Sequence, residues 1–216
     1  MSDPITVIIP VKTLAGAKTR LATRLSPSER IRLARGLLTH VLAVVNGVNV
    51  VERCVVVSPD PEVLEIARAA GAEPIVERDY RSGRGQNAAL EQARTAIQSD
   101  RPRAVLVLAS DLPLLNGEDL EGMAALALAE RTVVVGPDRR SEGTNALLVR
   151  PSDALPFCFG VDSFQRHCQE ANRRGFAVSE YRSNGVAFDL DYPEDLAELE
   201  RTVGVAHLLP SEVGQS

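Results

Sequence analysis

The chain alternates short apolar runs with longer segments of helical periodicity, and this alternation restricts the fold more than any other feature of the sequence. Ile5–Val11 and Ala104–Ala109 are almost wholly apolar, which is typical of strands buried on both faces of a parallel sheet. The pattern predicts an α/β, Rossmann-like fold, a mostly parallel mixed sheet with helices on both faces. Further strands are expected at 55–57, 74–76, 132–135, 145–149, 177–181 and 186–190, and helices from residue 27 and over 61–70, 88–98, 118–129, 163–174 and 193–202.

Length and charge limit the number of domains and the classes of partner. With 216 residues and no linker or repeat, the chain is expected to form a single domain, 1–216, with a loosely held tail at 204–216. A net charge of -5 disfavours nucleic acid as a partner. The three cysteines show no paired spacing, and no signal peptide or membrane span is evident, so we expect a cytoplasmic protein with reduced thiols.

Only two lysines occur in the chain, Lys12 and Lys18, and both lie in the segment PVKTLAGAKTRL, at the end of the first expected strand. Together with Arg20 they place three cations in one loop at a strand end, which favours phosphate binding. The alternative is a solvated cluster left by chance in an arginine-rich composition. Because the chain as a whole is acidic, an anionic ligand needs a local site of this kind.

Acidic residues follow two other apolar runs. Asp111 comes two residues after the run 104–109, and Asp189 and Asp191 alternate in FDLDYP. On a strand, residues two apart share a face, and adjacent carboxylates repel one another unless a cation lies between them. The three aspartates therefore predict a magnesium site. Asp111 is alternatively a turn residue, and Asp191 is equally well read as the N-cap of the last helix, with Glu194 completing a capping box.

A glycine-rich turn over 82–87 opens the third expected helix. Its spacing resembles a dinucleotide fingerprint, but it does not follow the first strand, and the lysine loop lacks the glycines of a phosphate-binding Walker loop. Backbone N–H groups of such a turn suit a base or a phosphate, and an ordinary loop is about as probable. In parallel sheets ligands bind beyond the carboxyl ends of the strands, so one crevice is expected to collect the lysine loop, this turn and Asp111.

Cations and carboxylates facing one another across a strand-end crevice favour nucleotidyl transfer. In that reaction a phosphate oxygen attacks the α-phosphorus of a nucleoside triphosphate, and charge stabilisation replaces a side-chain nucleophile. No Ser-His-Asp or Cys-His set is evident in the sequence. The rival interpretations are a sugar-phosphate or molybdopterin nucleotidyltransferase and a non-catalytic nucleotide-binding subunit.

Six segments, taken in order, resemble the guanylyltransferases of deazaflavin coenzyme (F-420) biosynthesis: PVKTLAGAKTRL, SGRGQNAAL, ASDLPLL, EGTNALLV, FGVDSF and FDLDYPEDL. The resemblance spans about Ile5 to Leu199 and implies the nucleotide-diphosphosugar-transferase-like fold. It implies magnesium-dependent transfer of GMP from GTP to a phosphorylated three-carbon acid. Phosphoenolpyruvate is the expected acceptor, with 2-phospho-L-lactate and 3-phospho-D-glycerate as alternatives. The next enzyme of the pathway and a homodimer are further expected partners.

The resemblance also implies roles for individual residues. Lys18 and Asp111 are expected to be catalytic. Gln86 and Tyr192 depart from the family pattern, beside the base and beside Asp191 respectively. The expected ligands are Lys12, Lys18, Arg20, Gly85 and Asn87 for the nucleotide, Asp111, Asp189 and Asp191 for magnesium, and Thr144, Gly160 and Ser163 for the acceptor.

Overall fold

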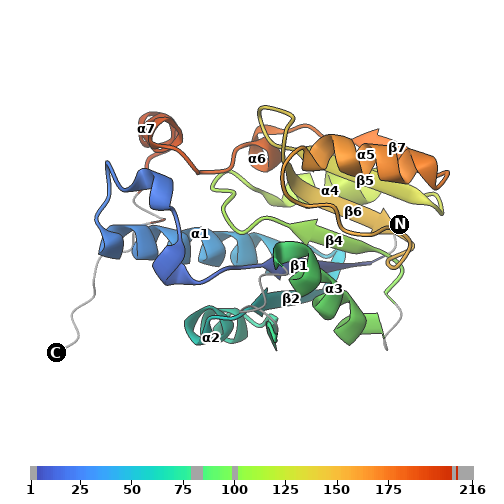
Figure 1. The fold of residues 1–216 in the computed structure, drawn as a ribbon, viewed down its shortest axis with the longest axis horizontal. Coiled ribbons are helices and arrows are strands. Elements are labelled where there is room, and N and C mark those ends of the chain that lie inside the picture. The colour runs from blue at the N-terminus through green and yellow to red at the C-terminus, as the bar shows by residue number, and fades with distance from the viewer. Residues whose placement is uncertain (1–3, 79–84, 99–101, 206–207, 209–216) are drawn as a thin grey trace.

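A computed structural model describes residues 4–78, 85–98, 102–205 and 208. Within them the chain forms one seven-stranded sheet in the order β3-β2-β1-β4-β6-β5-β7 (Figure 1). Gly83, part of the expected glycine-rich turn, and most of the expected tail lie outside the described residues. The strands are β1 Ile5–Pro10, β2 Val51–Ser58, β3 Glu73–Val76, β4 Val105–Leu108, β5 Thr132–Pro137, β6 Thr144–Arg150 and β7 Ala177–Glu180.

The sheet is mixed, and the described strands run parallel except for β6. β1 pairs in parallel with β2 and β4, whereas β6 is antiparallel to both β4 and β5. The reversal occurs in the loop between β5 and β6, where the Asp138 carboxylate accepts backbone N–H bonds from Arg140, Glu142 and Gly143. The predicted mostly parallel α/β sheet is confirmed.

Helices cover both faces of the sheet, as the alternation of apolar runs predicts. One face packs against α1, α2 and α4, and the other against α3 and α5. Ser26 caps α1, because Ser26 Oγ accepts from Glu29 N at 3.3 Å and Glu29 accepts from Ser26 N at 2.8 Å. The helices are α1 Pro27–Asn46, α2 Pro61–Ala69, α3 Gly85–Ile97, α4 Gly117–Leu126, α5 Ser163–Arg173, α6 Asn184–Ala187 and α7 Pro193–Thr202, with short 3₁₀ turns at Leu14–Gly16 and Thr19–Leu21.

The strand expected at 186–190 is wrong. Residues Asn184–Ala187 form the single-turn helix α6, capped by Ser183, and the chain then runs as a loop into α7. Val186 packs in the core on the side of the sheet that α1 covers. Phe188 and Leu190 belong to a separate apolar cluster. The alternating apolar residues therefore enter two different clusters, and they do not line one face of a strand.

That separate cluster holds the loop after β1 against the C-terminal part of the chain. Leu21 packs there with Leu190 and with residues of α1 and α7. The backbone N–H of Leu190 also donates to the carbonyl of Asp111 at 3.1 Å. Three segments far apart in sequence, after β1, after β4 and before α7, are thereby fixed side by side.

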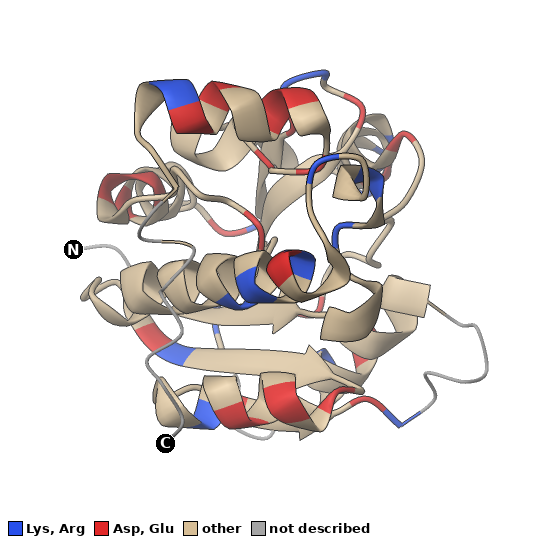
Figure 2. Ribbon diagram, turned by 90° about the vertical axis from the view of Figure 1, so that its left-hand side faces the viewer, with Lys and Arg blue, Asp and Glu red and all other residues tan. Residues whose placement is uncertain are grey.

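Charged residues of both signs are interspersed over the helices, and many of them form exposed ion pairs. Figure 2 shows basic and acidic positions along the same helices. Arg35 contacts Glu62 between α1 and α2, and Arg68 contacts Glu65 within α2. Within the described ranges, no helix is both long enough and apolar enough to cross a lipid bilayer.

Among the described residues of the expected tail, Leu208 is fully buried against α1. A Cβ atom added at Gly36 would lie 1.9 Å from the backbone oxygen of Leu208. We predict that Gly36→Ala lowers the free energy of unfolding by about 1–3 kcal/mol, because the helix and the tail cannot both keep their places. Urea denaturation measures this. Gly47→Ala is the matched control, since its nearest neighbour would lie at 3.4 Å, and an equal loss in both variants would contradict the packing of Leu208 on α1.

Candidate active site

A cleft of about 740 Å³ opens at the carboxyl ends of β1 and β4 and extends along the sheet to β3 on one side and β6 on the other. Arg20 lies at its rim, and Asn87 is not part of its wall. The one crevice expected from the strand ends is therefore present. The predicted site residues that line it are Lys12, Lys18, Gly85, Asp111, Thr144, Gly160, Ser163, Asp189 and Asp191.

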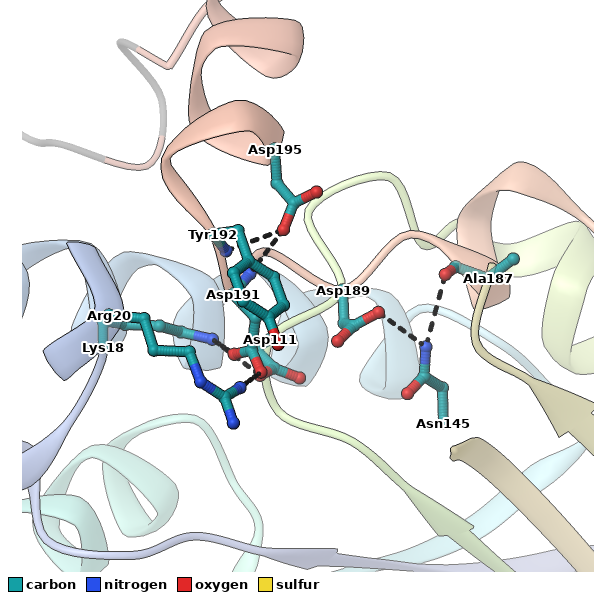
Figure 3. A network of polar contacts seen from close by, with 9 residues as sticks. All are labelled: Lys18, Arg20, Asp111, Asn145, Ala187, Asp189, Asp191, Tyr192 and Asp195. Atoms are coloured by element: carbon teal, nitrogen blue, oxygen red, sulfur yellow. Dashed lines mark hydrogen bonds and ion pairs between the residues drawn. The ribbon is translucent and has the colours of Figure 1, made fainter. Parts of the chain in front are cut away.

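Lys18 is held between two carboxylates (Figure 3). Its Nζ lies 2.6 Å from Asp111 Oδ2 and 3.1 Å from Asp191 Oδ1, and its side chain is only 7% exposed. Burial by itself lowers the pKa of Lys18, but the charges and hydrogen bonds of the two aspartates outweigh it and raise the pKa above the ordinary lysine value. The ammonium group is therefore charged throughout the physiological range.

The backbone at Lys18 is in the left-handed region, with φ 52° and ψ 36°. This conformation costs a non-glycine residue about 1 kcal/mol or more, and it persists only where the surroundings enforce it. Here the 3₁₀ turn that follows is fixed by the buried Leu21, and the ion pairs fix the side chain. The strain is thus localised at the residue that enters the acidic site.

The arrangement of charges differs from the sequence-based expectation in one respect. Lysine and arginine were expected to face the acids across an open crevice, but Lys18 and Arg20 contact them directly. Arg20 Nη1 lies 2.8 Å from Asp191 Oδ2, and its guanidinium stacks 4.9 Å from the centre of the Tyr192 ring. The reason is electrostatic, since half-buried carboxylates are costly without a partner.

Asp189 and Asp191 reach the site from the loop between α6 and α7, and not from one face of a strand. Burial first, and then the charge of Asp111, raise the pKa of Asp189 to about 6, while a hydrogen bond from Asn145 Nδ2 at 3.3 Å opposes the shift. Asn145 also donates to the carbonyl of Val186 at 3.0 Å, so it holds the C-terminal end of α6 beside Asp189.

The alternative reading of Asp191 as the helix cap, with Glu194 completing the box, is wrong. Tyr192 occupies the N-cap position of α7, and Asp195 takes the place in the capping box that was expected of Glu194. The Oδ2 atom of Asp195 accepts from the backbone N–H groups of Asp191 at 3.0 Å and Tyr192 at 2.7 Å (Figure 3). The carboxylate of Asp191 is therefore left for Lys18 and Arg20.

The three aspartates offer hard oxygen donors of the kind magnesium prefers. In the described residues, no group of three or more His, Cys, Asp or Glu side chains is arranged around a common point as metal ligands. The Nζ of Lys18 lies between Asp111 and Asp191, at the place where positive charge is needed. Burial first, and then repulsion from Asp111, raise the pKa of Asp189, and a divalent cation would relieve that repulsion. The three carboxylates are thus oxygen donors of the chemistry that magnesium requires, with Lys18 Nζ lying between two of them.

At the other side of the cleft, Thr144 and Ser163 form a hydrogen-bonded pair with the buried His167. Ser163 Oγ donates to Thr144 Oγ1 at 3.2 Å, and His167 Nδ1 lies 3.1 Å from the same oxygen. Gly160 lines the wall beside them, in a left-handed conformation with φ 121°. Ser163 is the first residue of α5, and Asp162 occupies the cap position.

Asn87 lies in the first turn of α3, and its amide is used by the backbone of another loop. Its Nδ2 donates to the carbonyl of Phe159 at 3.0 Å and its Oδ1 accepts from the N–H of the same residue at 2.9 Å. Both functional atoms of the amide are thus engaged by Phe159, a residue of the cleft wall, although Asn87 itself does not line the cleft. Gly85, by contrast, is the first residue of α3 and lines the cleft.

Comparison with known sequences agrees with this architecture. The sequence pattern of the family described as "Guanylyl transferase CofC like" matches residues 5–201, almost the whole chain. The chain belongs to this family. A phosphoenolpyruvate guanylyltransferase of Rubrobacter xylanophilus is 44% identical over 200 residues, covering 93% of this chain and 95% of the relative. A 2-phospho-L-lactate guanylyltransferase of Methanothermobacter thermautotrophicus is 40% identical over 194 residues, covering 89% and 82% respectively.

The fold of this guanylyltransferase is shared with solved nucleotidyltransferase-like structures. A putative nucleotide-diphospho-sugar transferase from Desulfovibrio desulfuricans superposes with a TM-score of 0.76 at 16% identity, covering 94% of this chain and 90% of that one. The expected nucleotide-diphosphosugar-transferase-like fold is therefore confirmed.

The sequence patterns did not single out two residues of the cleft wall, Asn145 and Glu77, or the supporting His167. Asn145 orients Asp189, and His167 supports Thr144. The spacing of four residues between Ser163 and His167 on one helix was an available signal for the second. Glu77 lines the cleft just after β3, where burial raises the pKa of its carboxyl and the charge of Lys12 opposes the shift. Its position became visible only when β3 was placed at the sheet edge.

His167 predicts a pH dependence of stability. Burial, then the charge of Arg166, lower the pKa of His167 to about 4 from the ordinary 6.5. The unfolded chain therefore binds the proton first, so this contribution is fully present above pH 6.5 and is lost as the pH falls from 6.5 toward 4. We expect His167 to remove about 2 kcal/mol from the free energy of unfolding between pH 7.5 and pH 5.

Urea denaturation at the two pH values, compared between wild type and His167→Phe, isolates this contribution. His40→Gln is the control, because His40 is half-buried at a separate place on α1. An equal pH dependence in wild type and His167→Phe would show that His167 takes up its proton in the folded protein as readily as in the unfolded chain.

Proposed function

We propose that this protein transfers GMP from GTP to phosphoenolpyruvate, forming enolpyruvoyl-2-diphospho-5'-guanosine and pyrophosphate. The observation that supports it most directly is the charged site at the strand ends, where the buried ammonium of Lys18 lies between Asp111 and Asp191. Such a site suits a reaction whose barrier is lowered by charge and not by a covalent nucleophile. The relative from Rubrobacter xylanophilus, which bears the name of this activity, supports the choice of acceptor.

In the proposed reaction an oxygen atom of the acceptor phosphate attacks the α-phosphorus of GTP. A phosphorus–oxygen bond forms, the bond from the α-phosphorus to the oxygen bridging to the β-phosphate breaks, and pyrophosphate leaves with that electron pair. Lys18 is proposed to neutralise charge at the α-phosphate, and Lys12 and Arg20 to bind the phosphates on either side. The proposal is supported by the position of Lys12 and Lys18 in the cleft wall and of Arg20 in a smaller hollow that shares Asp189 and Asp191 with the cleft.

Asp111, Asp189 and Asp191 are proposed to hold magnesium. When bound, the ion supplies Lewis-acid neutralisation of the phosphate oxygens. The protein supplies the orientation of the carboxylates, through the Asn145 bond to Asp189 and the Asp195 bonds to the backbone of Asp191.

A second acceptor, 2-phospho-L-lactate, is favoured by the relative from Methanothermobacter thermautotrophicus, and 3-phospho-D-glycerate is the third candidate. The three acids differ by small groups on one carbon, a difference worth only a few kcal/mol in a pocket. The free cysteines of the described chain suit a reducing compartment, so the proposal places the enzyme in the cytoplasm. A homodimer and contact with the next pathway enzyme remain part of the proposal.

Purified protein with GTP, magnesium and each of the three acids tests the function, with products separated by mass. We expect a product of GMP joined to phosphoenolpyruvate through a diphosphate. Asp111→Asn should lower kcat/KM by about 100- to 1000-fold, because it removes the charge that positions Lys18 and the proposed metal ion.

Binding of Mn²⁺, followed by electron paramagnetic resonance, is a readout of the same variant that does not depend on turnover. Asp153→Asn, an exposed position distant from the cleft, is the matched control. Turnover by Asp111→Asn at the wild-type rate would refute the role of Asp111, and turnover only with a sugar phosphate would refute the acceptor class.

The proposal also places the guanine base at the β3 end of the cleft, beside Glu77 and Gly85. A carboxylate accepts from two donors at once, and guanine presents N1–H and the N2 amino group on one edge. We predict that Glu77→Gln lowers kcat/KM for GTP about tenfold and narrows the preference for GTP over inosine triphosphate, which lacks the amino group. Steady-state kinetics with both nucleotides measure this. Glu121→Gln, an exposed position on α4, is the control. An unchanged preference for GTP over inosine triphosphate in Glu77→Gln would contradict the proposed position of the base.

A further inference from the structure

His167 is a fully buried histidine that joins three parts of the cleft wall. It lies on α5, its Nδ1 is 3.1 Å from Thr144 Oγ1 at the start of β6, and its Nε2 is 3.0 Å from the backbone nitrogen of Cys158. Its ring also packs edge-on against Phe159, with 4.8 Å between ring centres. Both nitrogens of the imidazole are therefore engaged by groups next to the cleft.

These contacts fix which nitrogen carries the proton. The backbone N–H of Cys158 can only donate, so His167 Nε2 accepts. Burial keeps the ring neutral at physiological pH, and a neutral imidazole with an accepting Nε2 carries its proton on Nδ1. His167 Nδ1–H then donates toward Thr144 Oγ1 at 3.1 Å, and it also meets the backbone carbonyl of Ser163, whose hydrogen bond with the ring opposes the lowering of the pKa of His167.

The Thr144 hydroxyl can make one further hydrogen bond, as a donor. Its oxygen accepts from His167 and also from Ser163 Oγ, which lies 3.2 Å away. A hydroxyl oxygen has two lone pairs, so both are occupied, and the remaining group is its own proton. Thr144 lines the cleft together with Asp189 and Gly160. A proton donor in the wall of a cleft suits an anionic oxygen of a ligand.

A second side chain holds the same loop from the opposite direction. Asn87 binds both backbone groups of Phe159, at 2.9 and 3.0 Å, while His167 binds the neighbouring N–H of Cys158. The loop that leads to Gly160 is thus fixed at two consecutive residues, from α3 and from α5. Neither Asn87 nor His167 lines the cleft, whereas Phe159, whose backbone Asn87 binds, is part of its wall.

We propose that His167 is the positioning residue of the acceptor end of the cleft, holding Thr144 so that its hydroxyl proton is donated to an anionic oxygen of the phosphorylated acid. The inference rests on the proposed function for the identity of that acid. His167 does not touch the substrate and acts through Thr144 and the loop at Cys158. A histidine that merely fills the core predicts a loss of stability with no selective effect on the acceptor.

Two variants and one control separate these outcomes by steady-state kinetics. His167→Phe keeps an aromatic ring but removes both hydrogen bonds, and His167→Asn restores an amide donor near the position of Nδ1. Val63→Ala truncates a fully buried side chain on the opposite face of the sheet and serves as the destabilised control. We expect His167→Phe to raise KM for phosphoenolpyruvate about tenfold to a hundredfold, with KM for GTP within about twofold, and His167→Asn to recover part of the loss.

The contrary result is an unchanged acceptor KM in His167→Phe, or equal increases of both KM values, and either would overturn the proposal. The ¹⁵N spectrum of histidine-labelled wild type gives a readout that needs no variant and no turnover. Its expected result is a bare Nε2 and a protonated Nδ1 for His167, and the opposite tautomer would also overturn the proposal. Failure of wild type to turn over GTP with any of the three acids would refute the proposed function, which this spectrum does not depend on.

Discussion

A buried ammonium group between two carboxylates is the interaction on which the rest of this site depends. The side chain of Lys18 is only 7% exposed, so its positive charge is almost fully removed from solvent. The side chains of Asp111 and Asp191 are each partly exposed. Removing either carboxylate would leave the buried ammonium with only one of its two compensating charges. The pairing therefore connects the loop after β1 to the loop after β4 and to the loop before α7. This is the place to which the proposed function assigns the triphosphate.

Apolar packing brings these charges together. Leu21 and Leu190 meet in one buried cluster, close in sequence to Lys18 and Arg20 on one side and to Asp189 and Asp191 on the other. The Leu190 N–H bond to the Asp111 carbonyl adds the third segment. The apolar packing and this backbone bond thus hold the loop after β1 close to the loop before α7, and the ion pairs form between residues adjacent to these contacts. This division explains how charges of both signs come to lie together at the strand ends.

Much of this architecture follows from sequence patterns, because apolar runs such as Ile5–Pro10 and Val105–Leu108 are buried on both faces and leave little choice of element. The meeting of Lys18 and Asp111 was also predictable, since ligand loops gather at the carboxyl ends of parallel strands, whereas Asp191 arrives from the loop between α6 and α7. The structure of segment 186–190 was not predictable, because alternating apolar residues are compatible with a strand. They are equally compatible with a helical turn and a loop whose side chains enter two different clusters. The hydrogen-bond partners of Asn87 and His167 could not be predicted from sequence, since Phe159 and Cys158 lie in an irregular loop that no periodicity locates.

The charge state of Lys18 tests the central claim most directly, and the chain makes the measurement simple because it has only two lysines. With ¹³Cε-labelled lysine, NMR titration of wild type, Asp111→Asn and Asp191→Asn follows the Lys18 signal alone, once Lys12→Arg has assigned it. The account predicts a Lys18 pKa above the ordinary lysine value in wild type, because two carboxylates hold the proton, and a lower pKa in each variant. A Lys18 that titrates at the ordinary value, unchanged by either substitution, would show that the ammonium does not lie between these aspartates.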